Sequence, residues 1–188
     1  MLIGVDDYTQ FTDLRFSVAD QKALAQQLIE SGFPKDQVFL LCDKAEDRKY
    51  LPFRTNIERQ LELVLGLSAP GDLVLVGFSG HGVHLNGKSY LCPSEARLDD
   101  PKQTMLALDG VYDRMARCRA SLKLLLVDAC RNDPRPEGLR SVDANRDLLT
   151  RVAGSQEQPP EGILLLTSCA AGQVSLEDKE FGHGVFMH

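Results

Sequence analysis

The 188-residue chain has no apolar run that approaches the roughly 20 residues needed to cross a bilayer, which excludes a membrane-embedded protein. Its amino terminus lacks a basic segment followed by a long apolar one, so we expect no secretory signal. The five cysteines are odd in number and have no paired metal-ligand spacing, which favours a reducing compartment over a disulfide framework. We therefore expect a cytoplasmic protein that does not act on membranes.

A surplus of positive charge is also missing. The formal net charge is −6, which argues against a nucleic-acid partner and is compatible with basic ligands or substrates. No glycine-rich phosphate loop follows the first predicted strand, and the chain has no zinc motif, internal repeat or low-complexity tract. What is present, 43% hydrophobic and 26% charged residues, is typical of a globular protein, and we expect one domain over residues 1–188.

The apolar pattern predicts strands that alternate with helices, which implies right-handed crossovers and a largely parallel sheet. Ser17 is expected to cap the first helix and Gly32 to end it, whereas Thr55 and Glu58 predict a capping box for the second. The predicted strands cover residues 2–5, 38–42, 73–79, 122–127 and 163–167, and the predicted helices cover residues 17–31, 55–65 and 106–119.

Three further segments complete the predicted domain. Asn86-Gly87, at the centre of residues 83–91, predicts a small antiparallel hairpin. Residues 131–162 have little apolar signal and are expected to form a long mobile loop. Residues 182–186 predict the start of a final strand, so we expect the domain to be truncated at its C-terminal end.

Two of the strands lead directly into side chains that can do chemistry together. One is followed by Gly80-His81-Gly82 and another by Asp128-Ala129-Cys130-Arg131. The carboxyl ends of parallel strands share the edge at which open α/β sheets bind ligands. A cysteine is a useful nucleophile at neutral pH when a neighbour favours the thiolate or removes its proton. Either residue alone could be structural, but together His81 and Cys130 form a candidate catalytic pair.

These two motifs resemble the His and Cys motifs of caspase-like cysteine peptidases. His81 stands 49 residues before Cys130 (130 − 81), and roughly 50 is the known caspase spacing. The sequence Asp-Ala-Cys-Arg-Asn departs from the caspase pattern Gln-Ala-Cys-Arg-Gly and is closer to metacaspases, paracaspases and bacterial caspase homologues. The resemblance implies a caspase-like three-layer α/β/α sandwich with a mostly parallel central sheet of about six strands, and a small hairpin after the catalytic His.

The resemblance also implies roles for individual residues. Cys130 would be the nucleophile, and His81 would protonate the leaving amine. The backbone N–H groups of Gly82 and Cys130 would donate to the oxyanion, although Gly82 could instead be only a turn residue. Ser175 belongs to a segment that resembles the one with which caspases hold the substrate backbone.

Three acids distinguish the predicted substrate pocket from that of caspases. By motif, Asp128 stands where caspases carry Gln, Glu177 stands where they carry Arg, and Asp20 matches the pocket Asp of metacaspases and paracaspases. Converging carboxylates raise one another's pKa unless a cation lies among them, and a substrate Arg or Lys supplies that cation. We therefore predict protein or peptide substrates with a basic residue before the cut. Each acid could also be structural, Asp20 as an exposed acid in the first turn of its helix.

A peptidase that cuts after basic residues could also cut its own loop after Cys130, and the candidate sites for this self-cleavage are Arg135, Arg140, Arg146 and Arg151.

Metacaspases often require calcium, but the matching position, Leu108-Asp109, lacks one acid of the usual pair. Asp99-Asp100 could compensate or could belong to a solvated loop, so we expect no required cofactor and no metal site. Fused or regulatory domains would be compatible with the family.

Two other functions are compatible with the sequence. One is a catalytically silent caspase-like domain that serves in signalling or as a scaffold, against which intact His81 and Cys130 argue. The other is a doubly wound domain that binds a small ligand, for which the phosphate loop is missing.

Overall fold

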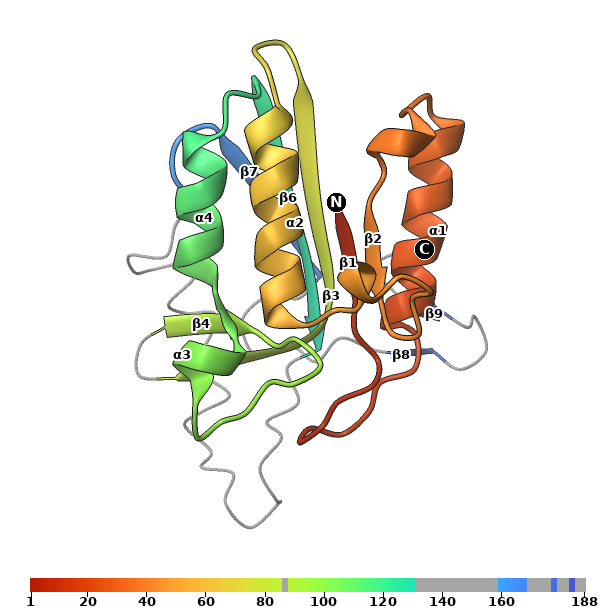
Figure 1. Ribbon diagram of the computed structural model, residues 1–188, viewed down its shortest axis with the longest axis vertical. Coiled ribbons are helices and arrows are strands. Elements are labelled where there is room, and N and C mark those ends of the chain that lie inside the picture. Colours follow the sequence, from red (N-terminus) through yellow and green to blue (C-terminus); the bar gives the residue numbers. More distant parts are fainter. Residues whose placement is uncertain (86–87, 131–158, 169–176, 179–182, 185–188) are drawn as a thin grey trace.

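The computed structural model of the chain describes residues 1–85, 88–130, 159–168, 177–178 and 183–184 (Figure 1). Its strands are β1 (Leu2–Gly4), β2 (Leu40–Cys42), β3 (Leu73–Leu85), β4 (Lys88–Leu91), β5 (Leu106–Ala107), β6 (Leu122–Cys130), β7 (Ile163–Thr167), β8 (Glu177–Asp178) and β9 (His183–Gly184). Its helices are α1 (Ser17–Glu30), α2 (Arg54–Leu67), α3 (Pro101–Thr104) and α4 (Leu108–Arg117), with short 3-10 turns η1 (Lys35–Gln37) and η2 (Arg48–Tyr50).

The central sheet has the predicted parallel arrangement. Its parallel strands lie in the order β2-β1-β3-β6-β7, and β4 and β5 extend it with antiparallel pairing beside the carboxyl half of β3. The predicted hairpin is confirmed by the pairing of Val83 with Tyr90, although the turn residues 86–87 lie outside the described part. The same pairing explains why β3 continues to Leu85, beyond its predicted end at residue 79.

Helices cover both faces of this sheet, as predicted. In Figure 1, α2 and α4 lie in front of β3 and β6, while α1 lies beside β1 and β2. Alternate residues of β1, β3 and β6 pack against α2 and α4 to form the main core, which includes Ile3, Val76, Phe78 and Leu125 from the strands and Ile57, Leu61, Val111 and Met115 from the helices. Because successive strand residues face opposite sides, Gly4 and Gly77 face α1.

The contact between α1 and the sheet differs from the prediction. The apolar residues that predicted this helix are only half-buried, and its buried residues are Ser17, Asp20 and Gln21. A Cβ atom at Gly4 would lie 2.8 Å from the Ser17 carbonyl oxygen, and one at Gly77 would lie 2.9 Å from Gln21 Oε1. The glycines therefore let α1 approach so closely that its buried side chains at the interface are polar rather than large and apolar.

Both predicted N-terminal caps are wrong. No side chain at the start of α1 caps it; instead Asp6 Oδ1 accepts the backbone N–H of Ser17 at 2.9 Å. Thr55 makes no capping box, and Glu95 Oε1 accepts the backbone N–H of Arg54 at 2.8 Å at the start of α2. These carboxylates come from distant loops, so local spacing could not identify them. Burial raises the pKa of both Asp6 and Glu95.

The end of α1 is set by a local glycine, whereas the start of α4 is set by pairing with a distant strand. Gly32 ends α1 as predicted, with φ of +102° and with the N–H of Phe33 donating to the Leu28 carbonyl oxygen at 3.0 Å. The helix predicted over residues 106–119 is wrong at its start. Residues 106–107 form β5 because they pair with Tyr90 and Leu91 of β4, and α4 begins only afterwards.

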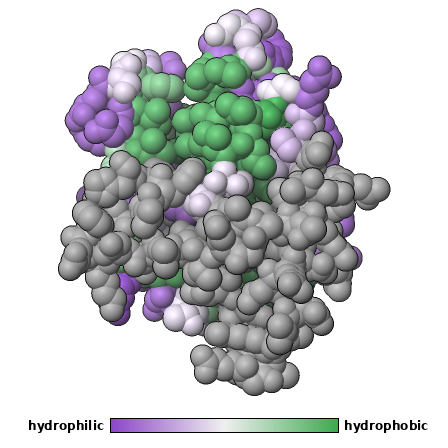
Figure 2. Space-filling view, turned by 180° about the vertical axis from the view of Figure 1, so that it is seen from behind, coloured by the Kyte–Doolittle hydropathy of each residue, from purple (hydrophilic) through white to green (hydrophobic). Residues whose placement is uncertain are grey.

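One face of β7 and of the start of β6 is partly exposed, whereas the sequence predicted strands buried on both faces. The exposed fraction is 48% at Leu122, 55% at Leu164 and 45% at Leu166. Figure 2 shows an apolar surface on this side of the molecule. The predicted final strand corresponds to β9, which pairs with β8 in a separate small sheet. No helix in the described ranges is long and apolar enough to cross a membrane.

Candidate active site

The carboxyl ends of β3 and β6 bring the two predicted catalytic positions together. Their parallel register pairs Ser79 with Asp128 and His81 with Cys130. Neighbouring strands lie about 4.8 Å apart, so His81 and Cys130 occupy adjacent backbone positions at the edge of the sheet. The side chain of Cys130 lies outside the described part of the structure.

The imidazole of His81 is buried and held in one orientation. The residue is 1% exposed, and its Nε2 lies 2.8 Å from the carbonyl oxygen of Thr12. A carbonyl oxygen can only accept, so Nε2 carries the proton in this bond. Nδ1 is also buried and has no hydrogen-bond partner among the described residues. In the neutral ring Nδ1 is therefore the nitrogen that can accept a proton.

The loop between β1 and α1 supplies the surroundings of this ring. Its centroid lies 4.7 Å from that of Tyr8 and 5.6 Å from that of Phe11. The Tyr8 hydroxyl accepts the backbone N–H of His81 at 2.8 Å, and burial raises the pKa of Tyr8 well above its usual value, which keeps the hydroxyl neutral. A Cβ atom at Gly80 would lie 2.6 Å from this hydroxyl. Glycine at position 80 therefore makes room for the Tyr8 side chain.

Tyr8, Phe11 and Thr12 are functional candidates that the sequence reasoning missed. Thr12 acts through its main-chain carbonyl, which leaves no signature in residue type. Tyr8 and Phe11 lie in the loop that begins at Asp6-Asp7, after β1. The only sequence signal for them is that this loop follows a strand expected to lie in the same sheet as the strand that leads into His81.

The backbone N–H of Gly82 points away from β4, its partner strand in the hairpin. The backbone N–H of Cys92 donates to the His81 carbonyl oxygen at 3.0 Å. In an antiparallel ladder this bond makes Gly82 and its register partner Leu91 a pair that exchanges no hydrogen bonds. A Cβ atom at Gly82 would lie 3.0 Å from the Cβ of Ala129, so close packing also favours glycine here.

Two of the three predicted pocket acids are buried on the side of the sheet that bears His81. Asp20 is 2% exposed and Asp128 is 5% exposed. Val127 and Ala129 line a hollow on the α4 side, so the intervening Asp128 faces the α1 side. The alternative of an exposed Asp20 is therefore wrong. Of Glu177 the structure describes only the backbone in β8, and β9, the partner of β8, contacts α1.

The remaining predicted residues lie outside the described part of the chain. They are Ser175, which was expected to hold the substrate backbone, and the expected self-cleavage sites Arg135, Arg140, Arg146 and Arg151.

The other cysteines with described side chains do not offer a rival nucleophile. Cys42, Cys92 and Cys118 are all buried and free. Burial raises the pKa of the Cys42 and Cys92 thiols, which keeps them protonated at neutral pH. Cys118 Sγ lies 2.8 Å from Ser68 Oγ and accepts the backbone N–H of Ala120 at 3.4 Å, as expected for a structural thiol.

Two of the acids considered for calcium, Asp99 and Asp100, already have a cationic partner. Arg97 forms ion pairs with both Asp99 and Asp100 at 3.5 Å, so a guanidinium already occupies these carboxylates. Calcium needs six to eight oxygen ligands, as a rough guide. Within the described ranges, no group of three or more His, Cys, Asp or Glu side chains could hold a metal ion.

Comparison with known proteins shows that the sequence is similar to metacaspases. Metacaspase-3 of Trypanosoma cruzi is 24% identical over 194 residues, which cover 94% of this chain and 53% of that protein. Metacaspase-1A of Aspergillus oryzae is 31% identical over 83 residues, which cover 44% of this chain and 20% of that protein. The chain thus spans about half the length of the first relative, at 53%.

A solved structure shares the fold. The crystal structure of protein GSU0716 from Geobacter sulfurreducens matches with a TM-score of 0.67 and 19% identity, and the match covers 98% of this chain and 76% of that one. The family model of the caspase domain matches residues 1–188. Because that model spans the full sequence and the fold is the predicted three-layer sandwich, the chain belongs to the caspase domain family.

Proposed function

We propose that this chain is the peptidase domain of a cysteine endopeptidase that uses Cys130 as nucleophile and His81 as proton carrier. The observation that carries the proposal is the register of β3 and β6, which pairs His81 with Cys130 at the carboxyl edge of the sheet. Membership of the caspase domain family and the similarity to metacaspases support the same activity. The catalytically silent alternative has no comparable support, because both reactive residues are present.

The proposed reaction begins with transfer of the Cys130 thiol proton to Nδ1 of His81. The thiolate then attacks the scissile carbonyl carbon, and the backbone N–H groups of Gly82 and Cys130 donate to the oxyanion that forms. The Nδ1–H of the imidazolium donates its proton to the departing amine, which leaves a thioester on Cys130. Water, deprotonated by His81, then hydrolyses the thioester and restores the thiol.

The Thr12 carbonyl assists this cycle through Nε2. A hydrogen bond of 2.8 Å from Nε2–H fixes the tautomer in which Nδ1 accepts the proton. When the ring becomes positively charged, the same carbonyl dipole stabilises it. Tyr8 holds the backbone of His81, so the ring does not have to reorient between the two proton transfers.

Specificity for Arg or Lys before the cut follows from the buried acids. Asp20 and Asp128 lie on the His81 side of the sheet, where an arginine side chain could pair with carboxylates through its planar fork. Glu177 is a third candidate, and its support is the contact of β9 with α1, the helix that bears Asp20. The proposal also includes self-cleavage in the loop after Cys130, no required metal, and action in the cytoplasm.

A panel of fluorogenic peptides with Arg, Lys or Asp before the cut tests this function. We expect turnover after Arg and Lys at least about 100-fold faster than after Asp, and none with Cys130→Ala. Asp128→Asn preserves shape but removes charge, and should lower kcat/KM for the Arg peptide about 10- to 100-fold. An active wild-type protein that cuts equally after Asp and Arg would contradict the acidic pocket.

Two controls separate the remaining parts of the proposal. A folded wild-type protein without turnover on any peptide would favour the silent domain. Mass spectrometry of the wild type beside Cys130→Ala tests self-cleavage, since identical fragments, or none, in both would remove it. Equal activity with and without a calcium chelator is expected because Arg97 occupies Asp99 and Asp100.

A further inference from the structure

A basic groove lies beside the hairpin that follows His81. It has a volume of about 430 Å³ and is bordered by residues of β4, β5, α3, α2 and α4. Four basic side chains and one acidic side chain line it, namely Arg54, Lys88, Lys102, Arg114 and Glu58. Its formal charge is thus +3 (four minus one), although the whole chain carries −6.

The positive charge of this groove is not neutralised from within. Glu58 Oε1 is shared by Arg54 at 3.1 Å and Arg114 at 3.4 Å, so one carboxylate serves two guanidinium groups. The backbone carbonyl oxygens of Gln103 and Gly110 accept from Arg54 and Arg114 and orient their guanidinium groups, and Arg114 also forms an ion pair with Glu62, outside the groove, at 4.0 Å. The two arginines are therefore fixed in place, and two carboxylates face their two guanidinium groups, so the excess positive charge of the groove rests on its lysines.

The two lysines add exposed charge at the rim. Lys88 in β4 and Lys102 in α3 are both exposed, and neither forms an ion pair with a side chain that the structure describes. A ligand with several negative charges would meet both lysines without displacing an existing partner. The groove is therefore suited to a multivalent anion.

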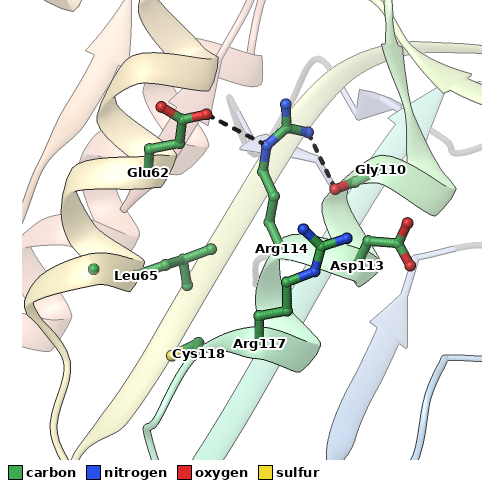
Figure 3. A pocket seen from close by; sticks show the side chains of 8 residues that line it. Glu62, Leu65, Gly110, Asp113, Arg114, Arg117 and Cys118 are labelled. Carbon is green, nitrogen blue, oxygen red and sulfur yellow. Dashed lines mark hydrogen bonds and ion pairs between the residues drawn. The ribbon is translucent and has the colours of Figure 1, made fainter.

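The neighbouring hollow shows that this charge is local. A hollow of about 540 Å³ lies between α2 and α4, and its lining includes Glu62, Asp113, Arg114 and Arg117. Figure 3 shows that Glu62 points toward Arg114. The acids and bases of this hollow balance, and the Arg114 guanidinium lies between Glu62 and the Gly110 carbonyl oxygen. This second hollow favours neither sign of charge, so of these two hollows only the one near β4 and α3 carries an excess of positive charge.

The basic groove lies at the same end of the sheet as His81. Figure 1 shows β4 and α3 beside the carboxyl ends of β3 and β6. The strand that carries His81 continues directly into the pairing with β4, in which Leu85 opposes Lys88. Tyr90 lines both this groove and the hollow that contains Gly82. The groove lies on the face of the sheet that bears α2 and α4, so a substrate bound at His81 reaches it by passing around the end of the sheet, beside Gly82.

We infer that this groove is a second substrate-binding site that takes an acidic segment, rich in Asp or Glu, of the protein substrate. The inference rests on the proposed peptidase function. It predicts substrates with opposite charges at two places: a basic residue at the cut and acids in a flanking segment. A long nucleic acid fits less well, because the chain as a whole carries a net charge of −6, which disfavours an extended polyanion more than a short peptide segment.

Binding is tested without catalysis, on the Cys130→Ala protein, with a fluorescently labelled Asp-Glu peptide. At low ionic strength we expect the double variant Lys88→Glu/Lys102→Glu to bind about tenfold more weakly or worse. The matched control is Lys22→Glu/Lys35→Glu, which makes the same change of charge at exposed positions in α1 and η1. Equal losses in the two variants, or equal binding of a neutral Gly-Ser peptide, would overturn the inference.

Catalysis supplies the second readout. An Arg peptide with an acidic tail should have a KM about tenfold below that of the same peptide with a Gly-Ser tail, with similar kcat, and the groove variant should abolish the difference. Turnover with equal KM for both tails would overturn the groove and leave the peptidase standing. Binding of the acidic peptide by a protein that cleaves neither substrate would support the acidic-peptide site and overturn the peptidase.

Discussion

The hydroxyl of Tyr8 offers a sharp test of how the candidate active site is built. It accepts the backbone N–H of His81 at 2.8 Å, while the Tyr8 ring packs 4.7 Å from the imidazole. Tyr8→Phe removes one oxygen atom and keeps the ring. The substitution therefore separates the hydrogen bond from the packing.

The expected cost follows from the burial of His81. Because this residue is 1% exposed, its N–H loses its partner in a place that water reaches poorly. Leaving a buried donor unpaired costs about 1–3 kcal/mol, and a shift of the reacting group by an ångström can lower a rate by about 100-fold. We expect a free energy of unfolding lower by about 1–3 kcal/mol and a kcat lower by about 10- to 100-fold, with little change in KM.

Guanidinium chloride unfolding, followed by circular dichroism, measures the stability, and the Arg peptide measures kcat. Tyr50→Phe is the matched control, since it removes the same atom from η2, away from His81, and should change stability by less than about 0.5 kcal/mol. If Tyr8→Phe behaves like Tyr50→Phe in both assays, the hydroxyl neither stabilises the strand end nor positions His81. A loss of stability without a loss of kcat would refute the positioning role alone.

Two further predictions concern the carboxylates that cap the helices. Asp6→Ala should lower the free energy of unfolding by about 1–2 kcal/mol because α1 loses its cap, whereas Thr55→Ala, at a position without a cap, should cost less than about 0.5 kcal/mol in the same urea titration. Burial raises the pKa of Glu95 above its ordinary 4.5, so the folded protein holds this proton more tightly and the contribution of Glu95 to stability falls as pH rises through that range. The difference in unfolding free energy between the wild type and Glu95→Gln should accordingly shrink from pH 4 to pH 7; a constant or growing difference would contradict the assignment.

The features that the sequence predicted correctly depend on local pattern. The apolar runs that end at Phe78 and Val127 have the composition of buried parallel strands, and two such strands in one sheet share an edge. That is why His81 and Cys130 could be paired before any coordinates were known. The hairpin followed from Asn86-Gly87 in the same way, because a two-residue turn is a local signal.

The features that it missed depend on contacts between distant segments. Asp6 and Glu95 cap helices that begin 11 and 41 residues away from them in sequence, so no short motif records the interaction. The boundary between β5 and α4 was misplaced because pairing with β4, not intrinsic propensity, decides it. The polar interface of α1 was missed since Gly77 permits it from another strand.

The bond between the His81 ring and the Thr12 main chain has a consequence for how this protein can diverge. A carbonyl oxygen is the same in every amino acid, so the residue at position 12 can be exchanged freely as long as the path of the loop is kept. Insertions or deletions between β1 and α1, in contrast, would move the oxygen away from the ring. Among active homologues, the length of this connection should be more tightly constrained than the identity of the residue at position 12.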